Sequence, residues 1–164
     1  MFKGIVVCVL GMMSVVAGSA QATIHVKSPD SSGTSTLQDP TASAAIQDYL
    51  QAWEGFRSAM AQNRADLLDS EFIGTAKDKL TATIKQQEAL GIRSAYQAKS
   101  HNIQIVFYSR DGLSLELIDD VDYDVQLLIH DRQSATKNVR ARYVVVMTPT
   151  ETKWRVRVFQ AVPE

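Results

Sequence analysis

The chain has 164 residues, with 17 basic against 18 acidic side chains and a formal net charge of −1. This length suits one domain with short extra segments, and the balanced charge excludes a general attraction to nucleic acid or anionic membranes. Cys8 is the only cysteine, which excludes a disulfide framework.

The first 22 residues have the three parts of a secretory signal peptide. Lys3 supplies the positive charge, Gly4 to Gly18 is an uncharged apolar stretch, and Ala20-Gln21-Ala22 is a small-residue cleavage signal. The apolar run is shorter than the roughly 20 residues that span a bilayer. We therefore expect cleavage before Thr23 and an exported bacterial protein, periplasmic or secreted, with no membrane span. Retention of the leader as an anchor is the alternative.

Cleavage would remove Lys3 and Cys8, taking the formal net charge from −1 to −2. A mature chain without cysteine has no thiol nucleophile and no thiolate metal ligand. Residues 23–40 then read as a flexible linker, because the serine- and threonine-rich stretch 28–36 has no apolar residue to bury. The folded domain is expected over residues 41–164.

Helices come first in this domain. One apolar face repeats at helical spacing after Pro40 and predicts an amphipathic helix with these members: Ile46, Tyr49, Leu50, Trp53, Phe56 and Met60. A short helix is expected over 63–69. A third is expected over 75–90, with Leu90 facing inward and Gly91 as its C-terminal stop.

Four strand-like runs follow, over 96–109, 113–130, 138–148 and 152–162. Asp111-Gly112 is a strong hairpin signal, and the polar stretch 131–137 predicts the next turn. The second run exceeds the usual strand length, so we expect a bulge at Asp119-Asp120. A hairpin turning at Asp111-Gly112 would place His101 opposite Asp122.

This order predicts an α+β fold, with two to three helices packed on a strongly bent antiparallel meander. The meander has four strands, or more if Glu71 to Ile73 adds one. The pattern resembles the nuclear transport factor 2-like superfamily, including SnoaL-like proteins, over about 42–161. The resemblance rests on the aromatic helix, the Asp111-Gly112 hairpin, and the closing pair around 140–146 and 154–156.

The resemblance implies a cone with a cavity between helices and sheet, and no particular activity, because members include enzymes, binders and assembly modules. For a ligand pocket in such a cavity, the aromatic candidates are Tyr49, Trp53, Tyr123 and Trp154. Enzymes with this fold use cavity carboxylates and histidines in proton transfer.

Asp119 and His101 are the candidates for such chemistry. Strict alternation places both in an apolar row, where a desolvated carboxylate would have a raised pKa and suit a general base. Burial of an unpaired charge is costly, so we favour a bulge that turns Asp119 outward. The expected register also offsets His101 from Asp119, and no catalytic residue is assigned.

Three further aspartates follow in the same strand at every second position: Asp120, Asp122 and Asp124. A calcium loop would need glycine where Val125 stands. We therefore expect cross-strand ion pairs with Arg140 and Arg142, or with Arg155 and Arg157. No metal site and no cofactor are expected, because the three histidines lack ligand spacing.

These features favour an exported, non-enzymatic domain that binds a small apolar ligand or a protein partner of the cell envelope. An acid–base enzyme of the isomerase, dehydratase or cyclase kind and a cell-envelope assembly module are the alternatives. Val144 to Met147 is apolar on both faces. If one face covers the helices, a homodimer across the sheet would cover the other.

Overall fold

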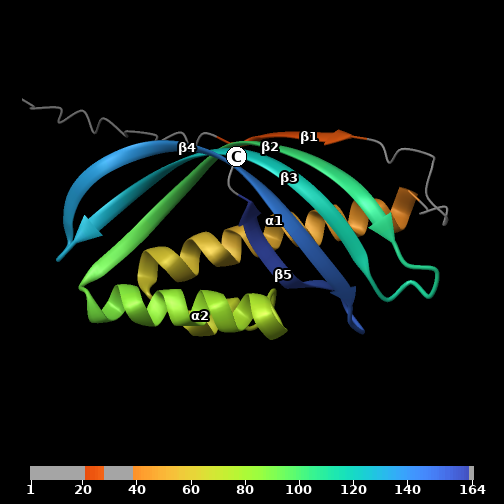
Figure 1. Ribbon diagram of the computed structural model, residues 1–164, viewed down its shortest axis with the longest axis horizontal. Helices are drawn as coiled ribbons and strands as arrows, with labels where there is room; N and C mark the ends of the chain where they lie inside the picture. The colour runs from red at the N-terminus through yellow and green to blue at the C-terminus, as the bar shows by residue number, and fades with distance from the viewer. Residues whose placement is uncertain (1–20, 28–38, 163–164) are drawn as a thin grey trace, which may run out of the picture.

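The computed structural model describes residues 21–27 and 39–162. Within them lie two α-helices, a short 3-10 helix and a five-stranded sheet in the order β1-β2-β3-β4-β5. Figure 1 shows the sheet as an arch, with α1 on its concave side. Most of the predicted leader, residues 1–20, and the serine-rich part of the predicted linker, 28–38, lie outside the described residues.

Helix α1 spans Asp39–Gln62 and confirms the predicted amphipathic helix. Pro40 stands in its first turn, where a missing backbone N–H costs no helical hydrogen bond. Asn63 ends the helix with a left-handed φ of 52°, and the N–H of Arg64 donates to the carbonyl of Ala59 at 3.0 Å. The side chain of Asn63 also donates to the carbonyl of Ile92, which ties this helix end to the sheet.

The 3-10 helix η1, Ala65–Leu68, matches the predicted short helix. Helix α2, Gly74–Ala89, matches the third. Gly91 follows it with φ 65°, in the left-handed conformation that ends helices. The inward placement of Leu90 is wrong. Its side chain is 57% exposed, because the helix has already ended and the chain is turning into the sheet.

The four long strands form an antiparallel meander: β2 Ile92–Tyr108, β3 Leu115–Ile129, β4 Arg132–Pro149 and β5 Trp154–Val162. The predicted bulge at Asp119-Asp120 is wrong, since both residues are paired regularly with β2 and β4. The irregularities in the β2–β3 ladder fall in β2, where Lys99 and Val106 are not paired with any residue of β3 in the register. Extra residues of this kind bend a strand and increase its twist.

The extra Val106 shifts the β2–β3 register by one residue. His101 therefore pairs with Val121 instead of Asp122, and Ile103 pairs with Asp119. The predicted turn over 131–137 is also wrong. His130 and Asp131 turn the chain alone, with φ of 49° and 63°, and β4 begins at Arg132. The first residues of β4 are exposed, which explains their polar character without a loop.

The N-terminal edge of the sheet differs from the predicted linker. Thr23–Lys27 forms strand β1 and pairs in parallel with β2, from Thr23 opposite Ser100 to Lys27 opposite Gln104. The suggested extra strand at Glu71 to Ile73 is a single parallel bridge between Phe72 and Val156.

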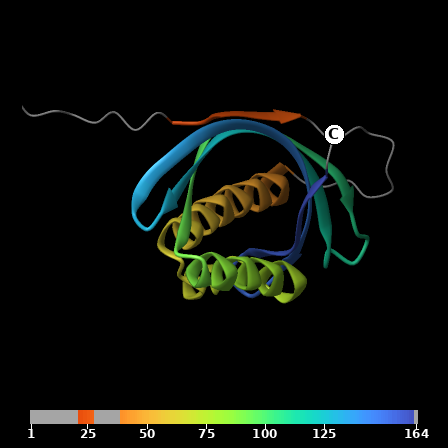
Figure 2. The same ribbon diagram turned by 60° about the vertical axis from the view of Figure 1, so that its left-hand side comes forward.

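Aromatic rings fill much of the space between α1 and the sheet. Trp53 lies at the centre, with ring centroids 5.2 to 6.1 Å from those of Phe56, His101, Tyr123, Tyr143 and Phe159. Figure 2 shows helix α2 running along the open side of the arch. The fold is therefore α+β and cone-like, with the core between α1 and the concave face of the sheet.

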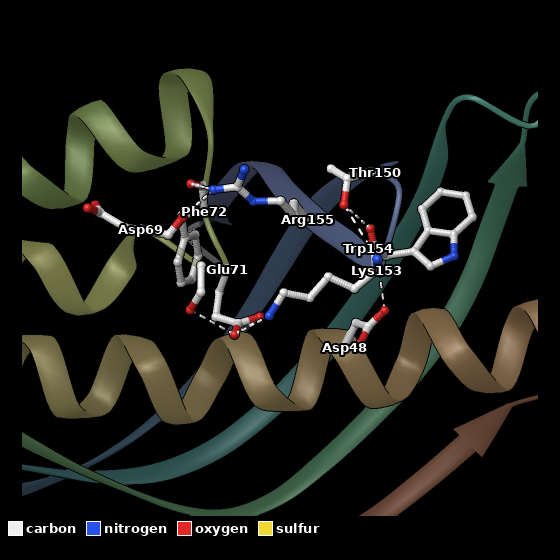
Figure 3. A network of polar contacts seen from close by, with 9 residues as sticks. Asp48, Asp69, Glu71, Phe72, Thr150, Lys153, Trp154 and Arg155 are labelled. Carbon is white, nitrogen blue, oxygen red and sulfur yellow. Dashed lines mark hydrogen bonds and ion pairs between the residues drawn. The ribbon is translucent and has the colours of Figure 1, made fainter.

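A polar network holds the segment before α2 against β5 (Figure 3). The Lys153 ammonium lies 2.5 Å from Oε1 of the buried Glu71 carboxylate. The Arg155 guanidinium donates to the carbonyls of Asp69 and Phe72. The N–H of Trp154 donates to Asp48 of α1 at 2.8 Å. These contacts tie the beginning of β5 to α1 and to the segment between η1 and α2.

Candidate functional site

Asp119 is completely buried, with 0% of its surface exposed. The expectation that it turns outward is therefore wrong. Because the extra residues lie in β2, alternation along β3 continues unbroken through Asp119 and places its side chain on the concave face. There it meets three hydrogen-bond donors, so the buried carboxylate is not the unpaired charge that made burial costly.

The three donors come from three positions in the fold. The Tyr49 hydroxyl of α1 donates to Oδ2 of Asp119 at 2.8 Å, and the backbone N–H of Asn102 donates to Oδ1 at 3.1 Å. The third is Nδ1 of His101, 2.7 Å from Oδ2. Trp53 Nε1 in turn donates to the Tyr49 hydroxyl at 2.7 Å. A hydrogen-bonded chain thus joins α1 to β2 through β3.

Burial and the nearby Asp119 carboxylate raise the pKa of Tyr49 well above its ordinary value. Loss of the Tyr49 proton would put a second negative charge in the same desolvated space. Tyr49 therefore stays a neutral hydrogen-bond donor to the carboxylate.

The carboxylate also sets the tautomer of a neutral His101 ring. A carboxylate only accepts hydrogen bonds, so the short contact places the proton of a neutral His101 ring on Nδ1. Among the described residues, Nε2 of the same ring has no hydrogen-bond partner. The His101 ring also packs edge-on against Trp53, with centroids 5.2 Å apart. The His101 ring is thus held in one orientation, and in its neutral form Nε2 is the nitrogen without a proton.

His101 lines a cleft of about 610 Å³ between α1 and the β1 edge of the sheet. Its other lining residues come from α1, from β1 and the two residues before it, and from β2: Gln21, Ala22, Ile24, Leu50, Gln51, Trp53, Glu54 and Ala98. The walls are mostly apolar, and His101 and Trp53, both almost fully buried, form the floor. This is the usual composition of a small-molecule site.

The four predicted pocket residues are all buried, but they do not share one pocket. Trp53 lines the cleft. Tyr49 is not in the cleft lining, and its hydroxyl donates a hydrogen bond to Asp119. Tyr123 packs within the aromatic core against Trp53. Trp154 is separate, with its ring 6.3 Å from that of Tyr108.

The outward-facing aspartates form cross-strand pairs, as expected. Asp120 pairs with Arg142 at 2.7 Å and Asp122 with Arg140 at 3.3 Å. Asp124 instead pairs with Lys99 at 2.8 Å. Hydrogen bonds lower the pKa of all three carboxyl groups: from Arg142 to Asp120, from Asn138 and Arg140 to Asp122, and from Lys99 and Asn138 to Asp124. Over residues 21–27 and 39–162, no group of three or more histidine, cysteine or carboxylate side chains is arranged to hold a metal ion.

Several cleft residues had no functional assignment from the sequence, chiefly Ile24, Leu50, Glu54 and Ala98. The sequence signal for the β1 wall of the cleft covered only five residues. Ile24 and Val26 alternate with polar residues across 23–27, a pattern typical of a strand. Once that strand is placed beside β2, its inward side chains face α1.

No protein-family model matches the chain, and no curated protein sequence does. Solved structures do resemble it. The intermembrane space region of the chloroplast protein ARC6 is 12% identical, with a TM-score of 0.62, over 79% of this chain and 100% of that one. A proposed scytalone dehydratase from Novosphingobium aromaticivorans is 10% identical, with a TM-score of 0.53, over 77% and 89% of the two chains.

A proposed dehydratase of the nuclear transport factor 2-like family from Streptomyces avermitilis is also similar. It is 11% identical, with a TM-score of 0.52, over 74% of this chain and 98% of that one. At such identities the likeness concerns the fold alone. The chain has the nuclear transport factor 2-like fold, which confirms the resemblance seen in the sequence.

In the part of the chain that the structure describes, neither helix is both long and apolar enough to cross a bilayer.

Proposed function

We propose that this domain binds a small, mostly apolar molecule in the His101 cleft. The observation that supports the proposal is the His101 ring in the lining of an apolar cleft, fixed from behind by a buried carboxylate. Asp119 fixes the His101 ring through Nδ1, so Nε2 is available to a ligand. Apolar walls would supply most of the binding free energy, and His101 would orient the one polar group of the ligand.

A matched pair of variants in β1 tests the location. Ile24 and Val26 face the same side of the strand and are 47% and 53% exposed, but only Ile24 lines the cleft. Titration calorimetry with decanol, a neutral probe, should show Ile24→Glu weakening binding about tenfold, which is about 1.4 kcal/mol. Val26→Glu should bind decanol as the parent chain does. Equal effects of the two variants, or no binding by the parent chain, would contradict the proposal.

Proton transfer at the same nitrogen is a second candidate function, favoured by the 2.7 Å contact between His101 and Asp119. A carboxylate behind Nδ1 stabilises the imidazolium that forms when Nε2 takes a proton. A ligand with an acidic C–H beside a carbonyl would then exchange that proton through Nε2.

Hydrogen–deuterium exchange measures this activity directly. In deuterated buffer, the α-protons of 2-decanone should exchange faster with the parent chain than in buffer alone, because Nε2 removes a proton and returns a deuteron. His101→Gln should abolish the acceleration while Asp120→Asn keeps it. Exchange at the buffer rate, or an undiminished rate with His101→Gln, would rule out acid–base chemistry and leave ligand binding standing.

A further inference from the structure

We propose that removal of the leader after Ala22 completes the cleft. Cleavage there would place the new α-ammonium group of Thr23 at the mouth of the cleft, so that the preferred ligand is a small apolar carboxylate. This inference rests on the proposed ligand-binding function and names the chemical class of the ligand.

The position of the new terminus follows from β1. Ala22 and Ile24 both line the cleft, and Ile24 pairs with His101 across the parallel ladder. The backbone nitrogen of Thr23 is bonded to Ala22. Cleavage of this bond removes Gln21 and Ala22 from the wall and leaves the amino group of Thr23 beside the space that Ala22 filled. The cleft becomes wider and gains a charge.

The two titratable side chains in the cleft lining, Glu54 and His101, already have partners. The Glu54 carboxylate is held by both of its oxygens on the Arg57 guanidinium, at 2.7 and 3.0 Å. The side of His101 that faces the sheet is held by Asp119. An α-ammonium group has an ordinary pKa of about 7.7 to 8.0, so it is mostly charged at pH 7. A cationic group beside apolar walls favours a ligand with an apolar body and one carboxylate.

Three forms of the protein separate the effect of charge from that of shape. The first begins at Thr23 with a free amino group, the second is the same chain acetylated on that group, and the third begins at Gly18 and so keeps Gln21 and Ala22. Each is titrated with decanoate and with decanol at pH 7. Mass spectrometry of the protein exported by a bacterial host establishes whether Thr23 is the natural first residue.

The ratio of decanoate affinity to decanol affinity should be roughly fivefold higher for the free-amine form than for the acetylated form. This is the effect expected of one partly exposed charge pair. The Gly18 form should resemble the acetylated form in this preference. Decanol binding with the same decanoate preference in all three forms would overturn this inference and leave the proposed function intact. A natural first residue other than Thr23 would also overturn it. No binding of either probe by any form would overturn both.

Discussion

Asp119 and Asp120 are neighbours on β3 with opposite environments, which makes them a matched pair for measurement. Asp119→Asn replaces a buried acceptor of three hydrogen bonds with a group that also carries donors, facing Tyr49 and His101. We expect urea unfolding to show a loss of about 3 kcal/mol. Asp120→Asn removes an exposed pair with Arg142 and should cost less than about 1 kcal/mol. Similar losses of stability for the two variants would mean that the buried hydrogen bonds of Asp119 do not anchor the core.

The buried tyrosines predict the alkaline behaviour of the protein. Burial raises the pKa of Tyr49, Tyr96 and Tyr143 in the folded state. Since the folded pKa values exceed the unfolded value of about 10, the stability linked to these groups is complete below pH 10 and is lost as the pH rises beyond it. Tyrosinate absorbance at pH 11 should therefore be lower in the folded protein than in urea. Equal absorbance in the two states would show that these hydroxyl groups are not buried.

At the scale of elements, the Glu71–Lys153 pair joins the segment before α2 to β5. Among the described residues, Oε2 of Glu71 is buried without a hydrogen-bond partner. The ammonium of Lys153, which contacts Oε1, compensates much of the carboxylate charge. Lys153→Met should reduce the free energy of unfolding by about 2 kcal/mol. Adding Glu71→Gln should recover most of that loss, because the uncompensated charge is then gone.

Lys77 provides the control for this pair. It also bridges to an aspartate, Asp69, but both side chains are largely exposed, so Lys77→Met should cost less than about 1 kcal/mol. A double variant at Glu71 and Lys153 that is no more stable than Lys153→Met alone would contradict the assigned role of the charge.

Helices, the hairpin at Asp111-Gly112 and the inward row of β3 could be predicted from the sequence, because each follows from periodicity or from a local turn signal. Asp119 belongs to that row, and the alternation alone placed it correctly. Its three donors could not be predicted, because they come from residues 17 to 70 positions away. Without them, burial of a carboxylate looked too costly.

The register between β2 and β3 also could not be predicted from the sequence. One unpaired residue, Val106, shifts the pairing of His101 by one position, and bulges have no firm sequence signal in a strand of ordinary β-formers. Strand β1 could not be predicted either, because five exposed residues beside a polar stretch gave little apolar signal. The cleft depends on both features, which is why its floor and its β1 wall were not predicted together.

At the scale of the whole molecule, the homodimer across the sheet stays a prediction. Val144 and Val146 on the convex face are half-buried, whereas Val145 and Met147 are fully buried on the concave face. Light scattering of the chain beginning at Thr23 should give twice the monomer mass if a second copy covers the convex valines. A monomer at all concentrations would exclude the dimer and leave the cleft unaffected.

We propose that Asp119 holds His101 so that Nε2 faces a ligand in the cleft. Nitrogen–proton correlation spectra of the histidine rings test it, since the chain has three histidines in all. We predict that Nδ1 of the His101 ring carries a proton and that the Nε2 signal of this ring shifts on addition of decanol, while that of His130 stays in place. A His101 ring without a proton on Nδ1, or a Nε2 signal that decanol leaves unchanged, would contradict this assignment.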